Sequence, residues 1–350
     1  MENNTLLQNI KQRINKYIQT FYTWQELHEA EVGETPRKTV WQRDKVRLMH
    51  YLSPQTTTYR TPLLVSYALI NRYHMMDLQS DRSLVKKLQQ YGADIYVLDT
   101  GYPNHTDRYL TMNDYVNGYL GGAIDFLRKQ YQLEKINLLG ICQGGTYAVM
   151  YAALHPQKIK NLITMVTPID FDNEEGIIFK WLKYIDADIL VDGMRGVIPG
   201  YVADVGFQMA KPMLKFRKAR TLLEIMDNKE AMLNYLRMEK WNNDQPSLAG
   251  EAAKEFIKAM FQQNLLIKGG LEIAQKPVNL SAIDMPILTI YAAEDHLVPP
   301  ATTKPLNDLV SSADKTLYEF PGGHVGVFTG RRSQAELAPT IAQWLKERDH

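Results

Sequence analysis

Residues 136–145 read INLLGICQGG, in which an apolar run that favours a strand leads into a turn of small residues. A stretch that favours a helix follows as far as Leu154. In turns of the form G-x-S-x-G, the central side chain is a nucleophile exposed between strand and helix. Cys142 takes that place, and it is the only cysteine in 350 residues. A lone intracellular cysteine is more often a small buried apolar side chain. The surrounding pattern favours catalysis, so we predict a nucleophilic thiol.

Three glycines lie around this cysteine. A turn that carries a nucleophile at its apex is sterically crowded, so the flanking positions must be small. Gly140, Gly144 and Gly145 meet this demand. The helix that begins near Gln143 would point its free amides and its positive dipole end at the sulfur. We therefore expect the turn to favour the thiolate form of Cys142.

The same turn predicts an oxyanion hole made of backbone amides. The N–H group of Gln143 would face the oxyanion of a tetrahedral intermediate. A second donor is expected from the loop after the apolar run at 62–69. We assign this second donor to the amides of Tyr67 and Ala68.

A thiol at neutral pH needs a base, and the chain order nucleophile, acid, histidine supplies one downstream. Asp295 lies in YAAEDHLVPP (291–300), just past a predicted strand, where the acid is expected. His324 lies in GGHVG (322–326), a glycine-rich loop after the last predicted strand. Asp170 and Asp172 follow another strand and are the fallback acids. We predict a triad of Cys142, Asp295 and His324.

The chain has eight histidines, and only His324 has this setting. His155 in LHP and His105 in PNHTD fit a helix end and a loop. His296 is next to the predicted acid, but two neighbouring side chains rarely both point into one site. We keep His296 only as a candidate substrate-binding residue and identify no other.

Strand and helix patterns alternate through most of the chain. An antiparallel hairpin is predicted at 39–52 and a helix at 80–92. Further helices are expected at 112–131, after the turn to Leu154, and at 334–348. Strands are predicted at 62–69, 93–99, 135–141, 159–168, 285–295 and 315–323. This rhythm indicates an α/β fold, with a parallel sheet covered by helices on both faces.

The rhythm stops after Pro168 and resumes near 285. Residues 173–275 are mostly helix-like and rich in Met, Lys and aromatic residues. We therefore divide the chain into an N-terminal helical segment (1–38), a core (39–172 and 276–350) and a helical cap inserted after the sixth core strand (173–275). Apolar residues at spacings of three and four predict an amphipathic helix over 5–30.

Composition excludes several classes of function. The net charge of +1 gives no general electrostatic reason for nucleic-acid binding. No apolar run is long enough to cross a membrane, and we expect no secretion signal. A single cysteine fits a reducing compartment, so the cytoplasm is the expected location. No metal or dinucleotide motif is present, and we expect no cofactor.

With GICQGG, DHLVPP and GGHVG in this order, the chain resembles the poly(3-hydroxyalkanoate) synthases. The likeness extends to PLLVSYALINRYHMMDLQSDRSLVKKL, DTGYPNHTDRYLTMNDYVNGYL and GGHVGVFTGRRSQAELAPTIAQWL, and so to most of 35–348. It implies an α/β-hydrolase fold and a Cys-Asp-His triad, carried here onto Cys142, Asp295 and His324. The short stretch before the first core strand resembles the catalytic subunit of the two-subunit synthases, as does the Gln after the cysteine. Thr100 and Asn104 depart from the Trp and Asp that are frequent in the family.

The resemblance implies a substrate, a product and partners. The substrate would be a 3-hydroxyacyl coenzyme A, most suitably a short-chain one such as 3-hydroxybutyryl-coenzyme A, and the product a polyester. A second synthase subunit, a homodimer contact through the cap and a place at polymer granules are further implied. The cap would keep water from the acyl-enzyme. The basic cluster KPMLKFRKAR (211–220) could meet coenzyme A phosphates, but a solvated helix face explains it better.

Two other functions share these residues. A cysteine hydrolase of the thioesterase or dienelactone-hydrolase kind would have the same fold and triad, but it would release free 3-hydroxy acid. A non-enzymatic subunit that coats storage granules or binds acyl chains would not need the triad. The intact set of Cys, Asp and His argues against the latter.

Overall fold

The computed structural model describes residues 32–350, with residue 174 and residues 211–212 excepted. The helix predicted over 5–30, and most of the segment 1–38, lie outside the described residues. The hairpin predicted at 39–52 is confirmed as β1 (Arg37–Arg43) and β2 (Val46–Tyr51), which pair in antiparallel fashion. The chain reverses between them at Asp44, which has a left-handed φ of 53°.

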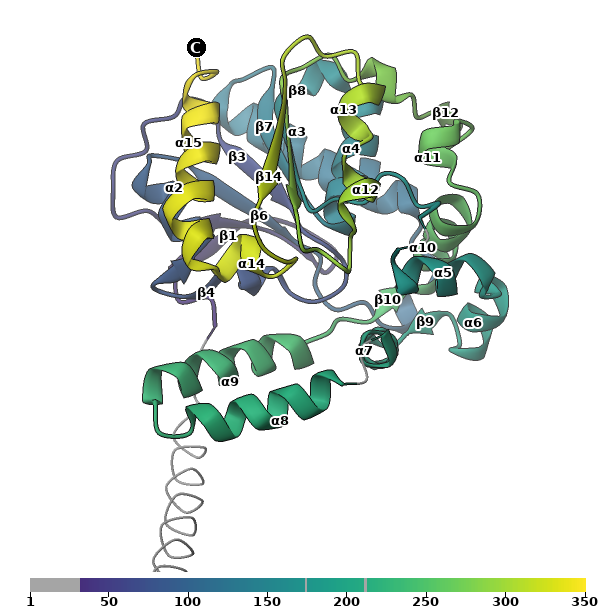
Figure 1. Ribbon diagram of the computed structural model, residues 1–350. Coiled ribbons are helices and arrows are strands. Elements are labelled where there is room, and N and C mark those ends of the chain that lie inside the picture. The colour runs from purple at the N-terminus through teal and green to yellow at the C-terminus, as the bar shows by residue number, and fades with distance from the viewer. Residues whose placement is uncertain (1–31, 174, 211–212) are drawn as a thin grey trace, which may run out of the picture.

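An eight-stranded sheet forms the centre of the molecule (Figure 1). Its order is β1-β2-β6-β3-β7-β8-β13-β14, and β2 is antiparallel to both of its neighbours. The strands from β6 to β14 are parallel. The remaining strands of the sheet are β3 (Leu63–Ser66), β6 (Ile95–Asp99), β7 (Ile136–Ile141), β8 (Ile159–Met165), β13 (Ile287–Ala292) and β14 (Lys315–Phe320).

Helices cover both faces of this sheet (Figure 1). α2 (Leu84–Gln90) and α15 (Ala338–Lys346) pack against each other on one face. α3 (Gly121–Tyr131) and α4 (Gln143–Leu154) lie on the other. Since neighbouring residues of a strand point to opposite faces, each strand supplies two apolar cores. The α/β-hydrolase fold predicted from the sequence is therefore confirmed.

Several predicted elements differ in extent from the structure. The strand predicted at 62–69 ends at Ser66, which leaves residues 67–69 in a loop. The helix predicted at 80–92 begins only at Leu84, with the Ser83 side chain accepting from the Lys86 amide at 2.9 Å. Before it lies a small hairpin, β4 (Asp77–Gln79) and β5 (Arg82–Ser83). The helices predicted at 112–131 and 334–348 both open with a wider π-helical turn, at Asp114–Leu120 and Ser333–Leu337.

The insertion follows β8, which is the sixth strand of the sheet in chain order, and it is mostly helical as predicted. Its helices are α5 (Ile177–Tyr184), α6 (Ala187–Gly193), α7 (Gly200–Ala210), α8 (Leu214–Ile225), α9 (Lys229–Asn243), α10 (Gly250–Phe256) and α11 (Leu265–Lys268). Two-residue strands also pair there: β9 (Val197–Ile198) with β10 (Leu248–Ala249) inside the insertion, and β11 (Glu272–Ile273) with β12 (Lys276–Pro277) across its C-terminal boundary. Three short helices follow β13 and β14: α12 (Pro300–Thr303), α13 (Leu306–Leu309) and α14 (Gly326–Thr329).

The insertion meets the core in two different ways. α5 and α10 pack into one of the core clusters through an aromatic group in which the rings of Phe171, Phe179, Phe256 and Phe261 lie 4.9–6.0 Å apart. α8 and α9 instead form a helical hairpin that lies outside the core, below β4 and α14 in the view of Figure 1. Only one side of α9 faces the core.

Candidate active site

Cys142 sits where β7 ends and α4 begins. Its backbone has φ 52° and ψ −129°, a conformation that residues with a Cβ rarely adopt. The surrounding hydrogen bonds hold it there. The Cys142 amide donates to the Met165 carbonyl at 3.0 Å, and the Cys142 carbonyl accepts from the Gly145 amide at 2.9 Å. The thiol is partly exposed at this apex, so it can meet a substrate.

The three predicted glycines are required by close packing. A Cβ on Gly140 would lie 2.7 Å from the Ala148 Cβ. One on Gly144 would overlap the backbone carbonyl of Tyr67. One on Gly145 would lie 2.8 Å from the Thr167 Cβ. The sharp turn thus depends on α4 approaching both β7 and the loop after β3.

Asp295 and His324 follow β13 and β14, two parallel neighbours of the sheet. Because the carboxyl ends of parallel strands meet at one edge, both side chains reach the edge that carries Cys142. His324 Nδ1 and Asp295 Oδ2 are 2.7 Å apart. The other carboxylate oxygen, Oδ1, accepts the amides of Leu297 and Val298, each at 2.9 Å. Asp295 is therefore buried, fully hydrogen-bonded and fixed in orientation.

The imidazole of His324 also interacts with the Cys142 side chain, so thiol, imidazole and carboxylate follow one another in the site. The imidazole is only 13% exposed. Burial alone would lower its pKa, but the negative charge of Cys142 and the hydrogen bonds to Asp295 and Cys142 outweigh burial. Together they raise the pKa of His324 to about 10. The imidazole of His324 is thus held in its protonated form beside the thiol.

The residues predicted for the oxyanion hole lie beside the elbow. Ser66, the last residue of β3, is in register with Gly140, so Tyr67 and Ala68 follow at the level of Cys142. The Gln143 amide belongs to the first turn of α4, where N–H groups have no acceptor within the helix. The Gln143 side chain also connects the start of α4 to the loop after β3, because its Oε1 accepts from the Leu69 amide at 3.3 Å.

Comparison with known proteins places this arrangement in a family. Residues 62–331 match the family described as "alpha/beta hydrolase fold", and residues 5–88 match "Poly-beta-hydroxybutyrate polymerase (PhaC) N-terminus". Proteins named poly(3-hydroxyalkanoate) polymerase subunit PhaC from Allochromatium vinosum and Synechocystis sp. are both 43% identical to this chain. The matches cover 91% and 95% of this chain and 90% of each relative. The chain belongs to the poly(3-hydroxyalkanoate) polymerase family.

More distant likeness supports the fold alone. A monoacylglycerol lipase from Paleococcus ferrophilus superposes with a TM-score of 0.52 at 16% identity, covering 84% of this chain and 96% of the lipase. An enol-lactonase from Burkholderia xenovorans gives a TM-score of 0.50 at 16% identity, covering 89% of this chain and all of the lactonase. The polymerase family therefore shares its scaffold with hydrolases.

The other sequence candidates of this polymerase-family chain lie in different settings. Asp170 accepts from the Asn264 side chain at 2.7 Å, and exposed Asp172 pairs with Lys183, so neither fallback acid is the partner of His324. His155 ends α4 and contacts the Asn117 side chain at 2.8 Å, and His105 lies in a short helical turn, as expected for both.

The remaining predictions concern substrate binding and metal ions. His296 is exposed beside Asp295, and a substrate role for it stays a prediction. The basic cluster at 211–220 begins at residues outside the described part, and its coenzyme A role also stays a prediction. Within the described residues, no three His, Cys, Asp or Glu side chains gather as metal ligands would.

Sequence reasoning did not identify the cap residues that pack against the core on the same face as Cys142. Met238 and Trp241 of α9 pack against the same apolar cluster as Cys142. Their spacing of three places them on one side of the helix, which is the signal that could have found them. Reasoning from sequence also missed Arg72, a buried cation in the loop after the oxyanion segment. Its signal is an arginine that follows the apolar and aromatic run YALI with only one polar residue between, in the sequence YALINRY.

Proposed function

We propose that this chain is the catalytic acyltransferase that polymerises (R)-3-hydroxyacyl groups from coenzyme A thioesters into polyhydroxyalkanoate, with release of coenzyme A. The observation that carries this proposal is the grouping of Cys142 with His324, which is hydrogen-bonded to Asp295, in a protein 43% identical to named polymerase subunits. Short-chain substrates such as 3-hydroxybutyryl-coenzyme A fit the likeness best.

The first half-reaction loads the enzyme. The Cys142 thiolate attacks the thioester carbonyl, a new C–S bond forms, and the bond to the coenzyme A sulfur breaks. The protonated His324 gives its proton to the departing thiolate, so coenzyme A leaves as a thiol. One thioester replaces another, which makes the step nearly isoenergetic. The acyl group stays activated on the enzyme, as the next step requires.

The second half-reaction makes the ester bond. His324, now neutral, accepts the proton of an incoming 3-hydroxyl group, whose oxygen attacks the acyl-cysteine carbonyl. The C–S bond breaks and the thiolate returns beside the imidazolium. Both oxygens of Asp295 are already occupied, one by His324 and the other by two backbone amides. This favours an orienting and charge-stabilising role for Asp295 over direct activation of the hydroxyl.

Each tetrahedral intermediate places a negative charge on the former carbonyl oxygen. The Gln143 amide, with Tyr67 or Ala68 across the elbow, supplies donors for that oxygen in this proposal. Donors fixed by the backbone need no reorganisation as charge develops. The close packing of Gly144 on Tyr67 supports this assignment, because it holds the two donor segments together.

The cap decides whether water or a hydroxyacyl group meets the acyl-enzyme. Met238 and Trp241 bring apolar surface to the cluster that contains Cys142. We infer that α9 excludes water there, as a polymerase needs and a hydrolase does not.

Partners follow from the same proposal. Relatives are named as subunits of a polymerase, which supports a second synthase subunit for this chain. A homodimer through the cap, a place at the surface of polymer granules in the cytoplasm, and action without a cofactor complete the proposal. No helix of the described residues is both long and apolar enough to cross a bilayer.

The test is to incubate the purified chain with 3-hydroxybutyryl-coenzyme A, with and without a co-purified partner subunit. Coenzyme A release and the products are measured separately. We expect polymer, and a larger yield with the partner. Free 3-hydroxybutyrate without chain growth would instead identify a hydrolase, and no release of coenzyme A would contradict both enzymatic functions.

A further inference from the structure

A buried arginine lies four residues past the predicted oxyanion donor Ala68. Arg72 is 4% exposed, and its Nη2 lies 2.8 Å from Oδ1 of Asp99, whose side chain is fully buried. Its Nη1 donates to the Gly101 carbonyl at 3.2 Å. Asp99 ends β6, the strand next to β3. The side chain of Arg72 therefore anchors the loop after β3 to the edge of the sheet.

The main chain of the same residue is bound by the cap. Trp241 of α9 donates its indole N–H to the Arg72 carbonyl at 2.6 Å. The guanidinium lies over the ring of Tyr102, 4.5 Å from its centre, and the Tyr102 hydroxyl donates to Asp244 at 2.6 Å. Asp244 caps the C-terminal end of α9, directly after Asn243. The main-chain carbonyl and the side chain of Arg72 are thus both connected to the C-terminal end of α9, one directly and the other through Tyr102.

The loop between this anchor and the elbow is short and conformationally constrained. Asn71 has a left-handed φ of 63°. Leu69 donates its amide to the Gln143 side chain at 3.3 Å, and Gly144 packs on the backbone of Tyr67. A displacement of residue 72 therefore has few residues over which to relax before it reaches the donors at Tyr67 and Ala68.

We propose that Arg72 is a positioning residue that sets the oxyanion amides of the loop after β3 in response to docking of α9 through Trp241. The inference rests on the proposed acyl transfer. It assigns Arg72 and Trp241 no contact with substrate. It makes the docked cap a condition for full stabilisation of the tetrahedral intermediate, in addition to its exclusion of water.

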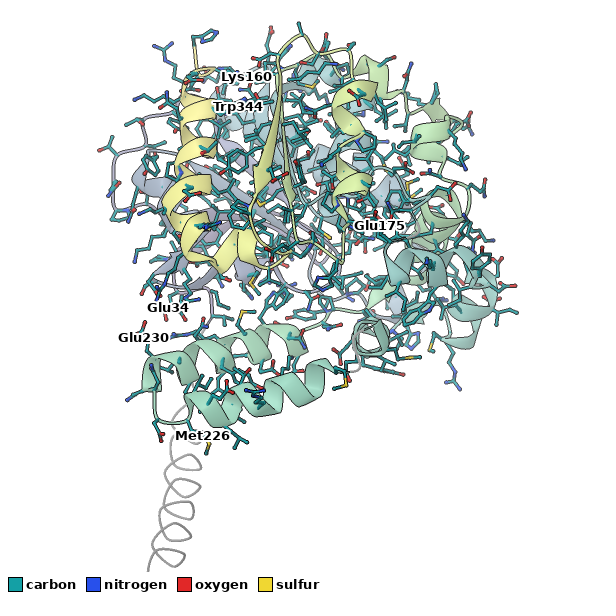
Figure 2. The ribbon with its side chains drawn as sticks, viewed as in Figure 1. Glu34, Lys160, Glu175, Met226, Glu230 and Trp344 are labelled. Atoms are coloured by element: carbon teal, nitrogen blue, oxygen red, sulfur yellow. The ribbon has the colours of Figure 1, made fainter. Side chains whose placement is uncertain are left out.

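The test compares Trp241→Phe and Arg72→Lys with two matched controls. Trp344→Phe removes another indole N–H. Trp344 lies on α15, far from α9 (Figure 2), and donates to the Thr316 side chain of β14 at 3.2 Å. Arg237→Gln removes an attachment of α9 to Glu34 and Gln79 that does not involve the loop at 67–72. Coenzyme A release gives kcat and KM, and iodoacetamide labelling reports the reactivity of Cys142, which needs no oxyanion hole.

We expect Trp241→Phe and Arg72→Lys each to lower kcat about tenfold, less than the loss of a whole oxyanion donor. KM and the labelling rate should change less than about twofold, because the nucleophile and its base are not displaced. The double variant should be no slower than the slower single variant, since both changes act through one loop. Both controls should keep kcat near the wild-type value.

Different results overturn different claims. If Trp241→Phe has the kcat of Trp344→Phe, or if labelling falls in parallel with kcat, the positioning role is wrong. If the effects of the two changes multiply, Arg72 and Trp241 act independently and the coupling is wrong. If the wild-type chain releases no coenzyme A from 3-hydroxybutyryl-coenzyme A, the proposed function fails and this inference fails with it.

Discussion

At the scale of the residue, the distinctive feature of the site is the raised pKa of His324 beside Cys142. A free thiol is mostly protonated near neutral pH, and a buried imidazole prefers to be neutral. Placed beside the thiol, with Asp295 behind it, the imidazole of His324 is stabilised in its charged form. The elbow therefore places a protonated imidazole next to the predicted nucleophile.

Replacing Asp295 with Asn tests the orienting role of the carboxylate. The amide keeps the size of the side chain but removes the charge that fixes the imidazole tautomer. The corresponding change in a Ser-His-Asp protease lowers turnover about 10⁴-fold. We expect Asp295→Asn to lower kcat for coenzyme A release at least about 10²-fold, with a smaller effect on KM. A fall of less than about threefold would contradict the assignment.

The pKa of His324, raised to about 10 from the usual 6.5, makes a second prediction. Because the charge of Cys142 is the largest influence that raises this pKa, Cys142→Ser should lower it. The measurement is the NMR titration of histidine ring protons, with His324→Gln to assign the resonance. An unchanged titration in Cys142→Ser would show that the two side chains do not interact.

The same pKa has a consequence for stability. A group whose pKa is higher in the folded state than in the unfolded state stabilises the fold while it is protonated. This contribution is fully present below about pH 6.5 and is lost as the pH rises through about 10. The stability difference between wild type and Cys142→Ser should therefore shrink between these pH values, as denaturant unfolding can measure.

At the scale of the element, the candidate active site is formed where the ends of several strands pack closely against α4. α4 packs on β7 and against the loop after β3, and glycine occupies each point of closest contact. The parallel register of β3 with β7 and of β13 with β14 brings four loops to one edge. The chemistry needs these approaches, because a shift of one loop separates donors from the nucleophile.

Gly144→Ala should disrupt this packing. The new Cβ would overlap the carbonyl of Tyr67, and the backbone of both segments would have to shift. We expect a loss of about 3 kcal/mol in the free energy of unfolding, measured by urea denaturation. Gly118→Ala is the control, because a Cβ at this helical position would meet no atom within 4 Å. It should leave stability unchanged or increase it by up to about 1 kcal/mol. Equal stability of the two variants would contradict the packing argument.

At the scale of the whole molecule, one chain combines a hydrolase scaffold with a cap suited to transfer. The sheet and its helices supply nucleophile, base and acid, and the α8–α9 hairpin approaches the same edge from outside (Figure 1). In the proposed function, the scaffold makes the acyl-enzyme and the cap determines whether water or a hydroxyl group attacks it. Transfer and hydrolysis would then differ through α9 more than through the triad.

Met238→Ala tests that division of roles. The smaller side chain opens the apolar cluster next to Cys142 and admits water to the acyl-enzyme. We expect the share of substrate that ends as free 3-hydroxy acid to rise severalfold, measured by chromatography of the products. Met226→Ala is the matched control, at the far tip of the α8–α9 hairpin (Figure 2). A product ratio that is the same in both variants would assign no water-excluding role to Met238.

Much of this architecture could be predicted from sequence, because local signals are strong where the chain alternates between strand and helix. GICQGG predicts a tight turn because its glycines are small enough for a crowded bend. Asp295 and His324 each follow an apolar strand, and parallel pairing brings the ends of these strands to one edge. The docking of α9 could not be predicted in this way. Its contacts join residues 72 and 241, which only tertiary packing brings together. No local sequence pattern predicts a contact between residues so far apart in the chain.

The sequence also did not predict where every strand ends. The strand after residue 62 ends three residues earlier than its apolar run, because the loop at 67–69 is buried by the elbow and not by strand pairing. Apolar residues can be buried in either setting, so hydropathy alone does not separate them. This distinction is functional, since the predicted oxyanion donors lie in the part that leaves the strand.

The most direct test of the central claim is the intact mass of the protein during turnover. Wild-type protein mixed briefly with 3-hydroxybutyryl-coenzyme A and quenched in acid should gain one or more hydroxybutyryl groups, and peptide mapping should place them on Cys142. Cys142→Ala should gain none and should release no coenzyme A. A Cys142→Ala protein that still forms the adduct, or that releases coenzyme A at the wild-type rate, would contradict the account.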